Sequence, residues 1–209
     1  MKLRIKIKFC GITNLDDAIS AASLGADALG FVFYSQSARY ISPNDAANII
    51  EKLPPFITTI GLFVDQTADE VKEIITLCEL NLLQFHGDED EPFCSGFNLP
   101  YIKAISMKSG INLLKCEKEF YSAKALLLDT YADDAKGGTG KVFDWNSIPS
   151  NISKPLIIAG GLNPINVKDL LELIHPYAVD VSGGIERSKG LKDYELMKNF
   201  ILGVTNASL

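Results

Sequence analysis

The chain lacks long apolar runs. No stretch approaches the roughly 18 consecutive apolar residues that suggest a membrane span. The first residues, MKLRIKIKFCG, alternate basic and apolar side chains and have no continuous apolar segment of the kind found in a signal peptide. These absences argue against a membrane partner and against secretion, and we expect a cytoplasmic protein.

Cysteine is scarce and scattered. The four cysteines are Cys10, Cys78, Cys94 and Cys116. They form no Cys-x-x-Cys pair, and no histidine has a spacing suited to zinc. Without a secretion signal, free thiols in a reducing compartment are expected rather than disulfides. We therefore expect no metal site.

Positive charge is in the minority. The chain carries 20 Lys and Arg against 26 Asp and Glu, a formal net charge of -6. Phosphate backbones attract basic surfaces, so this balance argues against a nucleic-acid partner. A small phosphorylated metabolite stays compatible with it, because a local site can supply amide donors or a few positive groups. Hydrophobic residues make up 47% of the chain, which argues against disorder.

Short apolar, β-branched runs alternate with longer amphipathic stretches along the whole chain. The predicted strands are Lys6–Cys10, Ala28–Phe33, Thr58–Val64, Leu82–His86, Tyr101–Ile105, Ala125–Asp129, Leu156–Ala159 and Ala178–Val181. The predicted helices are Asn14–Leu24, one opening at Ser42-Pro43, Thr67–Cys78, the short Asp88–Phe97 and Gly110–Glu119, one near Trp145–Ile148, and one opening at Asn163-Pro164.

Eight repeats of strand and helix predict a parallel sheet closed into a (β/α)8 TIM barrel. A doubly wound open sheet gives the same local alternation, but the chain has no Gly-x-Gly-x-x-Gly after its first strand. At 209 residues the chain is short beside the roughly 250 of a typical barrel, so few insertions are expected. No linker or low-complexity segment divides it, and we expect one domain over residues 1–209.

Active sites of such barrels lie at the carboxyl ends of the strands. Gly160-Gly161 follows the seventh predicted strand, and Ser182-Gly183-Gly184 follows the eighth. Glycines let the backbone approach a ligand and expose successive N–H donors. Either pair alone could simply make a tight turn, but together after the last two strands they predict a phosphate site.

Strand parity assigns the first strand's side chains to two faces. Ile7 and Phe9 would face the helices, which points Lys8 and Cys10 into the barrel. A buried Lys8 needs an acidic partner, and Asp180 on the neighbouring last strand is suitably placed. Cys10 is then either a small buried apolar residue or a thiolate base or nucleophile.

Three further side chains stand near the predicted mouth of the barrel. Asp129 follows three leucines at the end of the sixth strand, where it could also cap the next loop. Arg39 follows the second strand and is either a solvated side chain or a two-pronged donor to a carboxylate. His86 ends the fourth strand and is either structural or catalytic.

Taken in order, several segments resemble the phosphoribosylanthranilate isomerase family of tryptophan biosynthesis. They are Lys8-Phe9-Cys10-Gly11-Ile12-Thr13, Gly30-Phe31-Val32-Phe33 with Ser37 to Ile41, Gln84-Phe85-His86-Gly87, Leu128-Asp129-Thr130, Gly137-Gly138-Thr139-Gly140-Lys141 with Phe143-Asp144-Trp145, Ala159-Gly160-Gly161-Leu162, and Val179-Asp180-Val181-Ser182-Gly183-Gly184-Ile185-Glu186.

The resemblance implies an Amadori rearrangement of N-(5-phosphoribosyl)anthranilate to 1-(2-carboxyphenylamino)-1-deoxyribulose 5-phosphate, with no cofactor. In it Asp129 is the general acid, with a raised pKa, and Cys10 is the general base, through a lowered pKa or with help from substrate charge. Arg39 holds the anthranilate carboxylate.

The same resemblance has Gly160, Gly161, Ser182, Gly183 and Gly184 hold the phosphate. His86 and Gly138 are further possible site residues, with no assigned role. The glycines of residues 137–141 suit either a loop that closes over substrate or a plain surface loop.

Two rival functions share parts of this pattern. The histidine-pathway sugar-phosphate isomerase runs the same chemistry in a similar barrel, but it has Asp rather than Cys on the first strand. A non-enzymatic phosphate-binding barrel would keep the glycine loops without a reason to keep Cys10, Asp129 and Arg39 together. We expect a monomer or a homodimer acting on a small phosphorylated substrate.

Overall fold

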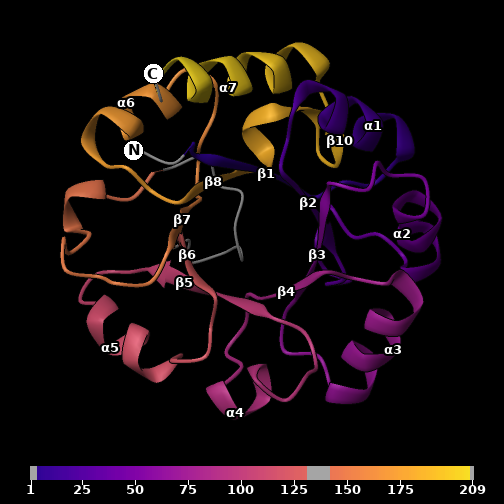
Figure 1. Ribbon diagram of the computed structural model, residues 1–209, viewed down its shortest axis with the longest axis horizontal. Helices are drawn as coiled ribbons and strands as arrows, with labels where there is room; N and C mark the ends of the chain where they lie inside the picture. Colours follow the sequence, from indigo (N-terminus) through magenta and orange to yellow (C-terminus); the bar gives the residue numbers. More distant parts are fainter. Residues whose placement is uncertain (1–3, 131–141, 208–209) are drawn as a thin grey trace.

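Eight parallel strands close into a barrel in the computed structural model, which describes residues 4–130 and 142–207. Each strand pairs with the next, and the last pairs with the first (Figure 1). The strands are β1 (Lys6–Cys10), β2 (Ala28–Val32), β3 (Thr58–Phe63), β4 (Leu82–Phe85), β5 (Tyr101–Met107), β6 (Ala125–Thr130), β7 (Leu156–Ile158) and β8 (Ala178–Val181). The closed barrel confirms the predicted fold class, and each predicted strand is found within two residues of its bounds.

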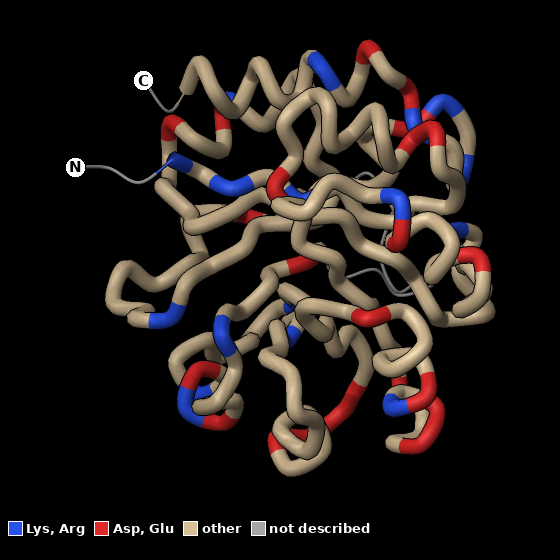
Figure 2. Tube along the Cα trace, turned by 45° about the vertical axis from the view of Figure 1, so that its right-hand side comes forward, with Lys and Arg blue, Asp and Glu red and all other residues tan. Residues whose placement is uncertain are grey.

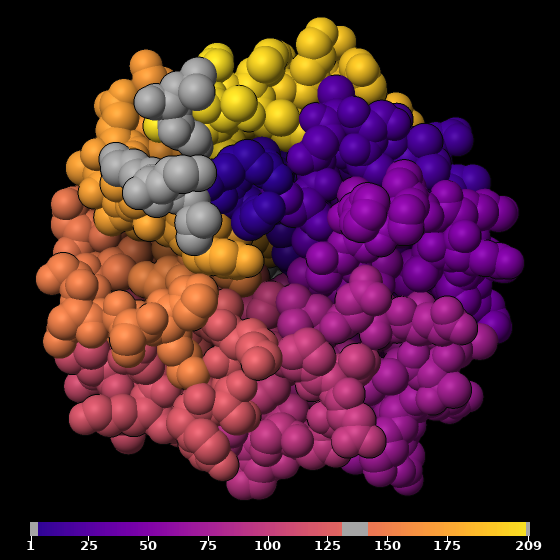
Figure 3. All heavy atoms as spheres, in the orientation of Figure 1, coloured from indigo at the N-terminus to yellow at the C-terminus, as the bar shows by residue number. Residues whose placement is uncertain are grey.

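Helices surround the barrel in the order of the sequence. They are α1 (Leu15–Leu24), α2 (Pro43–Ile50), α3 (Ala68–Cys78), α4 (Glu91–Cys94), α5 (Leu113–Glu119), α6 (Val167–Leu173) and α7 (Tyr194–Ala207). Figure 3 shows this succession as a ring of colour in which the yellow C-terminal helix lies beside indigo N-terminal residues. Figure 2 shows Lys and Arg mixed with Asp and Glu over the outer helices and loops. No helix in residues 4–130 and 142–207 is long and apolar enough to cross a membrane.

Three of the predicted helix starts are explained by side-chain caps. The Asn14 side chain accepts a hydrogen bond from the backbone N–H of Asp17, and Gly25 ends the helix at φ 102°. Ser42 caps α2 with Pro43 at its first position. Thr67 caps α3 in a reciprocal arrangement with Glu70.

Other helix predictions were wrong in extent. The helix expected from Asn163 begins only at Val167, because the Asn163 side chain accepts from the N–H groups of Ile165 and Asn166 and forms a turn instead. The segments predicted as Asp88–Phe97 and Gly110–Glu119 form α4 and α5, which are shorter and begin after the caps Asp90 and Asn112. The segment near Trp145–Ile148, which was predicted to be a helix, forms a 3-10 turn over Trp145–Ser147.

A small antiparallel hairpin follows β8 and was not predicted. It joins β9 (Glu186–Ser188) to β10 (Leu191–Lys192), with Lys192 directly opposite Glu186. A 3-10 turn over Gly183–Ile185 precedes it. After the hairpin, α7 packs beside α1 and α6 and completes the ring of helices.

Strand alternation divides the core into two layers, as predicted for β1. Ile7 and Phe9 are buried in the large apolar layer between the strands and the helices. Lys8 points inward, and its Nζ lies 3.0 Å from Asp180 Oδ1, with the two side chains only 4% and 7% exposed. The register of the neighbouring strands sets Lys8 beside Asp180. This confirms the predicted ion pair.

Replacing Asp180 with asparagine should lower the free energy of unfolding by about 3 kcal/mol, because it leaves the Lys8 ammonium buried without a counter-charge. Urea unfolding at neutral pH measures the change. Asp69→Asn is the matched control, since the Asp69–Lys72 pair is exposed and contributes at most about 1 kcal/mol. Equal stabilities of the two variants would contradict the importance of the buried pair.

Candidate active site

A cavity of about 450 Å³ opens among the carboxyl ends of the strands. Nine of the predicted site residues line it, and they are Cys10, Arg39, His86, Asp129, Gly160, Gly161, Ser182, Gly183 and Gly184. The tenth, Gly138, lies outside the residues that the structure describes, as does the 137–141 segment. Residues as far apart as the first and last strands therefore meet around one space.

Cys10 lies at the end of β1 and is 6% exposed, packed with Val32, Leu62 and Val64. Opposite it in the register is Gly30, where an added Cβ would lie 2.8 Å from Cys10 Sγ and 3.1 Å from Lys8 Nζ. A glycine at this position therefore leaves room for both side chains.

Burial raises the pKa of the Cys10 thiol, although the neighbouring Lys8 ammonium opposes the shift. The lowered pKa offered by the sequence as one route to a thiolate is therefore not present. A raised pKa favours the thiol form of Cys10 over the thiolate in the free protein near neutrality.

Asp129 lies at the end of β6 and is held on both carboxylate oxygens. Its Oδ1 accepts from the backbone N–H of Thr130 at 2.8 Å, and its Oδ2 lies 3.2 Å from His86 Nε2. On the other side of the ring, His86 Nδ1 lies 2.9 Å from Gln84 Nε2. With the Gln84 amide as donor, Nε2 carries the imidazole proton toward Asp129.

His86 is thus linked to both Gln84 and Asp129 and is not an isolated histidine. Gln84 is fully buried, and its contact with His86 was not predicted from the sequence. A signal was present, because residues 84 and 86 are two apart on one strand and share a face.

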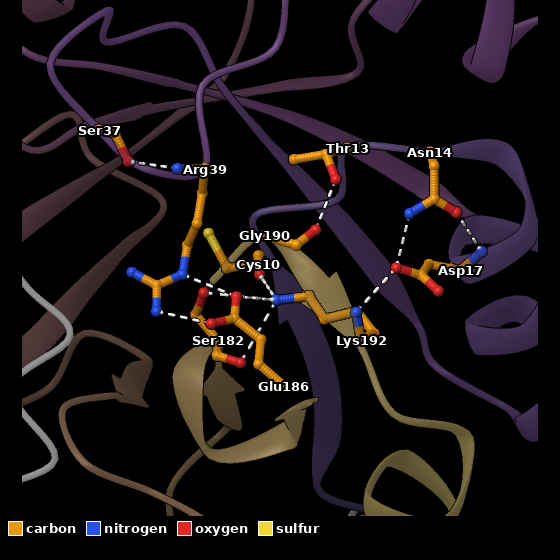
Figure 4. Close-up of polar contacts among 10 residues, drawn as sticks. All are labelled: Cys10, Thr13, Asn14, Asp17, Ser37, Arg39, Ser182, Glu186, Gly190 and Lys192. Atoms are coloured by element: carbon orange, nitrogen blue, oxygen red, sulfur yellow. Dashed lines mark hydrogen bonds and ion pairs between the residues drawn. The ribbon is translucent and has the colours of Figure 1, made fainter. Parts of the chain in front are cut away.

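Arg39 follows β2 and makes a two-pronged pair with Glu186 (Figure 4). Its Nε lies 2.7 Å from Glu186 Oε1 and its Nη2 lies 2.8 Å from Oε2. The hydrogen bonds that Arg39 donates to Glu186 raise the pKa of Arg39 above its ordinary value. Arg39 is therefore a held cation at the rim of the cavity and not a freely solvated side chain.

The two glycine loops approach their neighbours too closely for any side chain. Gly160 has φ 78°, and a Cβ added there would lie 2.3 Å from Thr130 Oγ1. A Cβ on Gly184 would lie 1.9 Å from the carbonyl oxygen of Leu162, in the loop after β7. The loops after β7 and β8 thus pack against each other and bring backbone into the cavity wall, where N–H groups suit an anion.

The donor set does not resemble a metal centre. Within the part of the chain that the structure describes, no group of three or more His, Cys, Asp or Glu residues is arranged to hold a metal ion. The side chains around this cavity offer a carboxyl group and a thiol that can exchange protons with a bound molecule, beside a guanidinium.

Comparison with known proteins gives a consistent match. A family profile described as N-(5'-phosphoribosyl)anthranilate (PRA) isomerase matches residues 7–202. The chain is 50% identical over 202 residues to an N-(5'-phosphoribosyl)anthranilate isomerase of Nitrosospira multiformis, covering 97% of each chain. It is 50% identical over 200 residues to one of Pseudomonas fluorescens, covering 96% of this chain and 98% of that one.

Solved structures agree with the sequence relatives. Phosphoribosyl anthranilate isomerase from Thermotoga maritima superposes with a TM-score of 0.90 at 37% identity, covering 97% of this chain and 99% of that one. A phosphoribosyl anthranilate isomerase in complex with reduced 1-(o-carboxyphenylamino)-1-deoxyribulose 5-phosphate superposes with a TM-score of 0.83 at 36% identity, with the same coverage.

Proposed function

Because the chain belongs to the family of N-(5'-phosphoribosyl)anthranilate isomerases, we propose that Cys10 is the general base and Asp129 the general acid of its reaction. The chain is an isomerase of tryptophan biosynthesis that converts N-(5-phosphoribosyl)anthranilate into 1-(2-carboxyphenylamino)-1-deoxyribulose 5-phosphate. The observation that supports the residue roles is that the acid, the base, Arg39 and both glycine loops line one cavity.

The substrate has an anionic group at each end, and the cavity has a site for each. Arg39 receives the anthranilate carboxylate through its guanidinium. The backbone of Gly160, Gly161, Ser182, Gly183 and Gly184 receives the phosphate. Holding both ends lays the ribose across the space between β1 and β6, where Cys10 and Asp129 end their strands, and such positioning supplies much of the rate acceleration.

Asp129 begins the reaction as the acid. It transfers its proton to the ring oxygen of the ribose, the bond from C1 to that oxygen breaks, and the nitrogen lone pair forms a protonated C1=N Schiff base. His86, 3.2 Å from Oδ2, keeps the carboxyl group oriented and stabilises the carboxylate that remains. This makes His86 a positioning residue for the acid.

Cys10 completes the reaction as the base. It takes the proton from C2, and the electron pair moves into the C1–C2 bond while the iminium nitrogen becomes neutral. The resulting enolamine then tautomerises to the ketone. The positive iminium makes C2 acidic, and the Lys8 ammonium near Cys10 stabilises the thiolate that burial disfavours.

We further propose that the protein works in the cytoplasm on a small phosphorylated substrate, without a nucleic-acid or membrane partner. Its cysteines support a reducing compartment, since all four are free and buried. One similar structure is of monomers generated from a dimeric isomerase of this kind from Thermotoga maritima, so we propose that this protein is a monomer or a homodimer.

The expected result for the wild-type protein is rapid loss of phosphoribosylanthranilate fluorescence when the substrate is generated in place from anthranilate and phosphoribosyl pyrophosphate. The histidine-pathway aminoaldose, offered under the same conditions, should not turn over at a comparable rate, because the first strand carries Cys10 and not Asp. A folded protein that binds the substrate without converting it would favour the phosphate-binding barrel. Preference for the histidine-pathway substrate would favour that isomerase.

A further inference from the structure

Glu186 and Lys192 are not among the proposed catalytic groups, yet their charged side chains are buried beside the cavity. We propose that they are positioning residues, which hold Arg39 so that one edge of its guanidinium faces the cavity and receives the substrate carboxylate (Figure 4). The inference rests on the proposed role of Arg39, and the experiment below separates the two.

Glu186 occupies one edge of the guanidinium. Its two oxygens accept from Nε at 2.7 Å and from Nη2 at 2.8 Å, and its side chain is only 5% exposed. A guanidinium has five N–H donors in a fixed plane, so a carboxylate that takes one edge leaves Nη1 and the outer N–H of Nη2. In Figure 4 the third guanidinium nitrogen points away from Glu186. A second carboxylate can therefore bind end-on without displacing the first.

Lys192 holds Glu186 in turn. Its Nζ donates to Glu186 Oε1 at 2.9 Å and to the carbonyl oxygen of Cys10 at 2.6 Å, with the carbonyl of Ser182 at 3.3 Å. The Lys192 side chain is 0% exposed, so its three N–H groups depend on these oxygens. The Lys192 ammonium therefore contacts the end of β1 at Cys10, the start of the loop after β8 at Ser182, and the Glu186 carboxylate that holds Arg39.

The hairpin that carries both residues is fastened to the first repeat of the barrel. Lys192 N–H donates to Asp17 Oδ2 at 2.8 Å, and Asn14 Nδ2 donates to the same oxygen at 2.7 Å. The Thr13 hydroxyl donates to the carbonyl of Gly190 at the hairpin turn. These hydrogen bonds attach the hairpin to α1 and to the loop that joins it to β1. The position of Arg39 relative to Cys10 is therefore set by contacts within the protein.

The charges of Arg39, Glu186 and Lys192 also favour binding of a substrate carboxylate. Arg39 and Lys192 share the single carboxylate of Glu186, so with Lys192 protonated the cluster keeps one positive charge uncompensated. Burial lowers the pKa of Lys192, and the Glu186 carboxylate opposes that shift. Burial raises the pKa of Glu186, but the bonds from Arg39 and Lys192 outweigh burial and leave the pKa below its ordinary value. An ionised Glu186 therefore orients the arginine without cancelling its attraction for an anion.

The test measures how strongly the protein prefers a ligand with the carboxylate over the same ligand without it. We would measure by calorimetry the Kd of the reduced product analogue, 1-(o-carboxyphenylamino)-1-deoxyribulose 5-phosphate in reduced form, and of the same molecule without its carboxyl group. The ratio of the two values is the preference for the carboxylate. A general loss of packing or of phosphate binding changes both values together and leaves the ratio unchanged.

Glu186→Gln should lower this preference by about tenfold, because the amide can accept at only one of its two positions and the guanidinium loses its fixed edge. Attraction by charge alone predicts the opposite sign, since the variant raises the charge of the cluster by one. Glu186→Asp keeps the charge but shortens the side chain, and its preference should fall as well. An unchanged or increased preference in both variants would overturn the positioning role.

Arg39→Ala separates this inference from the function on which it rests. If Arg39→Ala leaves the preference unchanged, the carboxylate site itself is wrong. If Arg39→Ala abolishes the preference while both Glu186 variants keep it, only the positioning role fails. Glu195→Gln serves as the matched control, because Glu195 lies in an exposed pair with Lys198 on α7 and should keep both Kd values. Thermal unfolding of each variant checks that it is folded.

Discussion

Replacing Cys10 with alanine is expected to lower kcat by about a thousandfold, which is the usual contribution of a positioned general base. Alanine removes the group that accepts the C2 proton and leaves the remainder of the cavity wall in place. Lys8 is paired with Asp180, and Asp129 is held from the opposite side, so neither is free to replace the thiol. Steady-state turnover of phosphoribosylanthranilate measures the effect.

The matched control is another buried free cysteine. Cys116 on α5 is 9% exposed and does not line the cavity, so Cys116→Ala should keep kcat within about twofold of the wild type. Turnover at the wild-type rate by Cys10→Ala would mean that a different group removes the C2 proton.

The pH dependence of the reactivity of Cys10 tests the state of its thiol in the free enzyme. Since burial raises the Cys10 pKa, the thiolate fraction of the free enzyme increases with pH through neutrality. We expect the rate of alkylation of Cys10 by iodoacetamide, taken as the difference between the wild type and Cys10→Ala, to keep rising beyond the ordinary thiol pKa of about 8.5. A plateau below pH 7 in the wild type would show that the thiolate is already formed in the free enzyme.

Replacing Asp129 with asparagine is expected to lower kcat by about a thousandfold while leaving the Kd of the reduced product analogue within about threefold. Asparagine keeps the size of the side chain and an oxygen for the Thr130 N–H, but it has no proton to give to the ribose ring oxygen. Ring opening therefore becomes limiting, and the protein should accumulate bound substrate. Stopped-flow fluorescence distinguishes binding from conversion.

Two further variants test this assignment of the acid. Asp169→Asn on the exposed side of α6 is the control for loss of a carboxylate, and it should turn over normally. His86→Gln should reduce kcat by about tenfold only, because it removes the bond that orients Asp129 and not the acid itself. Near-wild-type turnover by Asp129→Asn would remove Asp129 from the mechanism.

Some features of this protein follow from sequence alone because they depend on local periodicity. Strand alternation placed Lys8 and Cys10 inside and Phe9 outside, and the structure agrees. The order of eight strands then led to the closed barrel, and the rule that sites lie at carboxyl ends led to Cys10 and Asp129. The helices predicted to start at Asn14, Ser42 and Thr67 do begin there, because each of these side chains caps the helix through a residue three positions later.

The sequence predicted local structure less well where two kinds of local structure compete for the same residues. Asn163-Pro164 has the composition of a helix start, but the Asn163 side chain bonds to the N–H groups two and three residues later and makes a turn. A helix and such a turn draw on the same residues at the same spacing, so local composition does not separate them.

The environments of the site residues were decided by tertiary structure. Arg39 and Glu186 are 147 residues apart, and Lys192 meets Cys10 across 182 residues, so no periodicity within one element connects them. The raised pKa of Cys10 likewise arises from burial against residues of β2 and β3, and it persists although the Lys8 ammonium opposes it. Periodicity along the chain therefore determined which side chains enter the barrel mouth, while closure of the barrel decided their partners, because those partners come from strands and loops that only the closed sheet brings together.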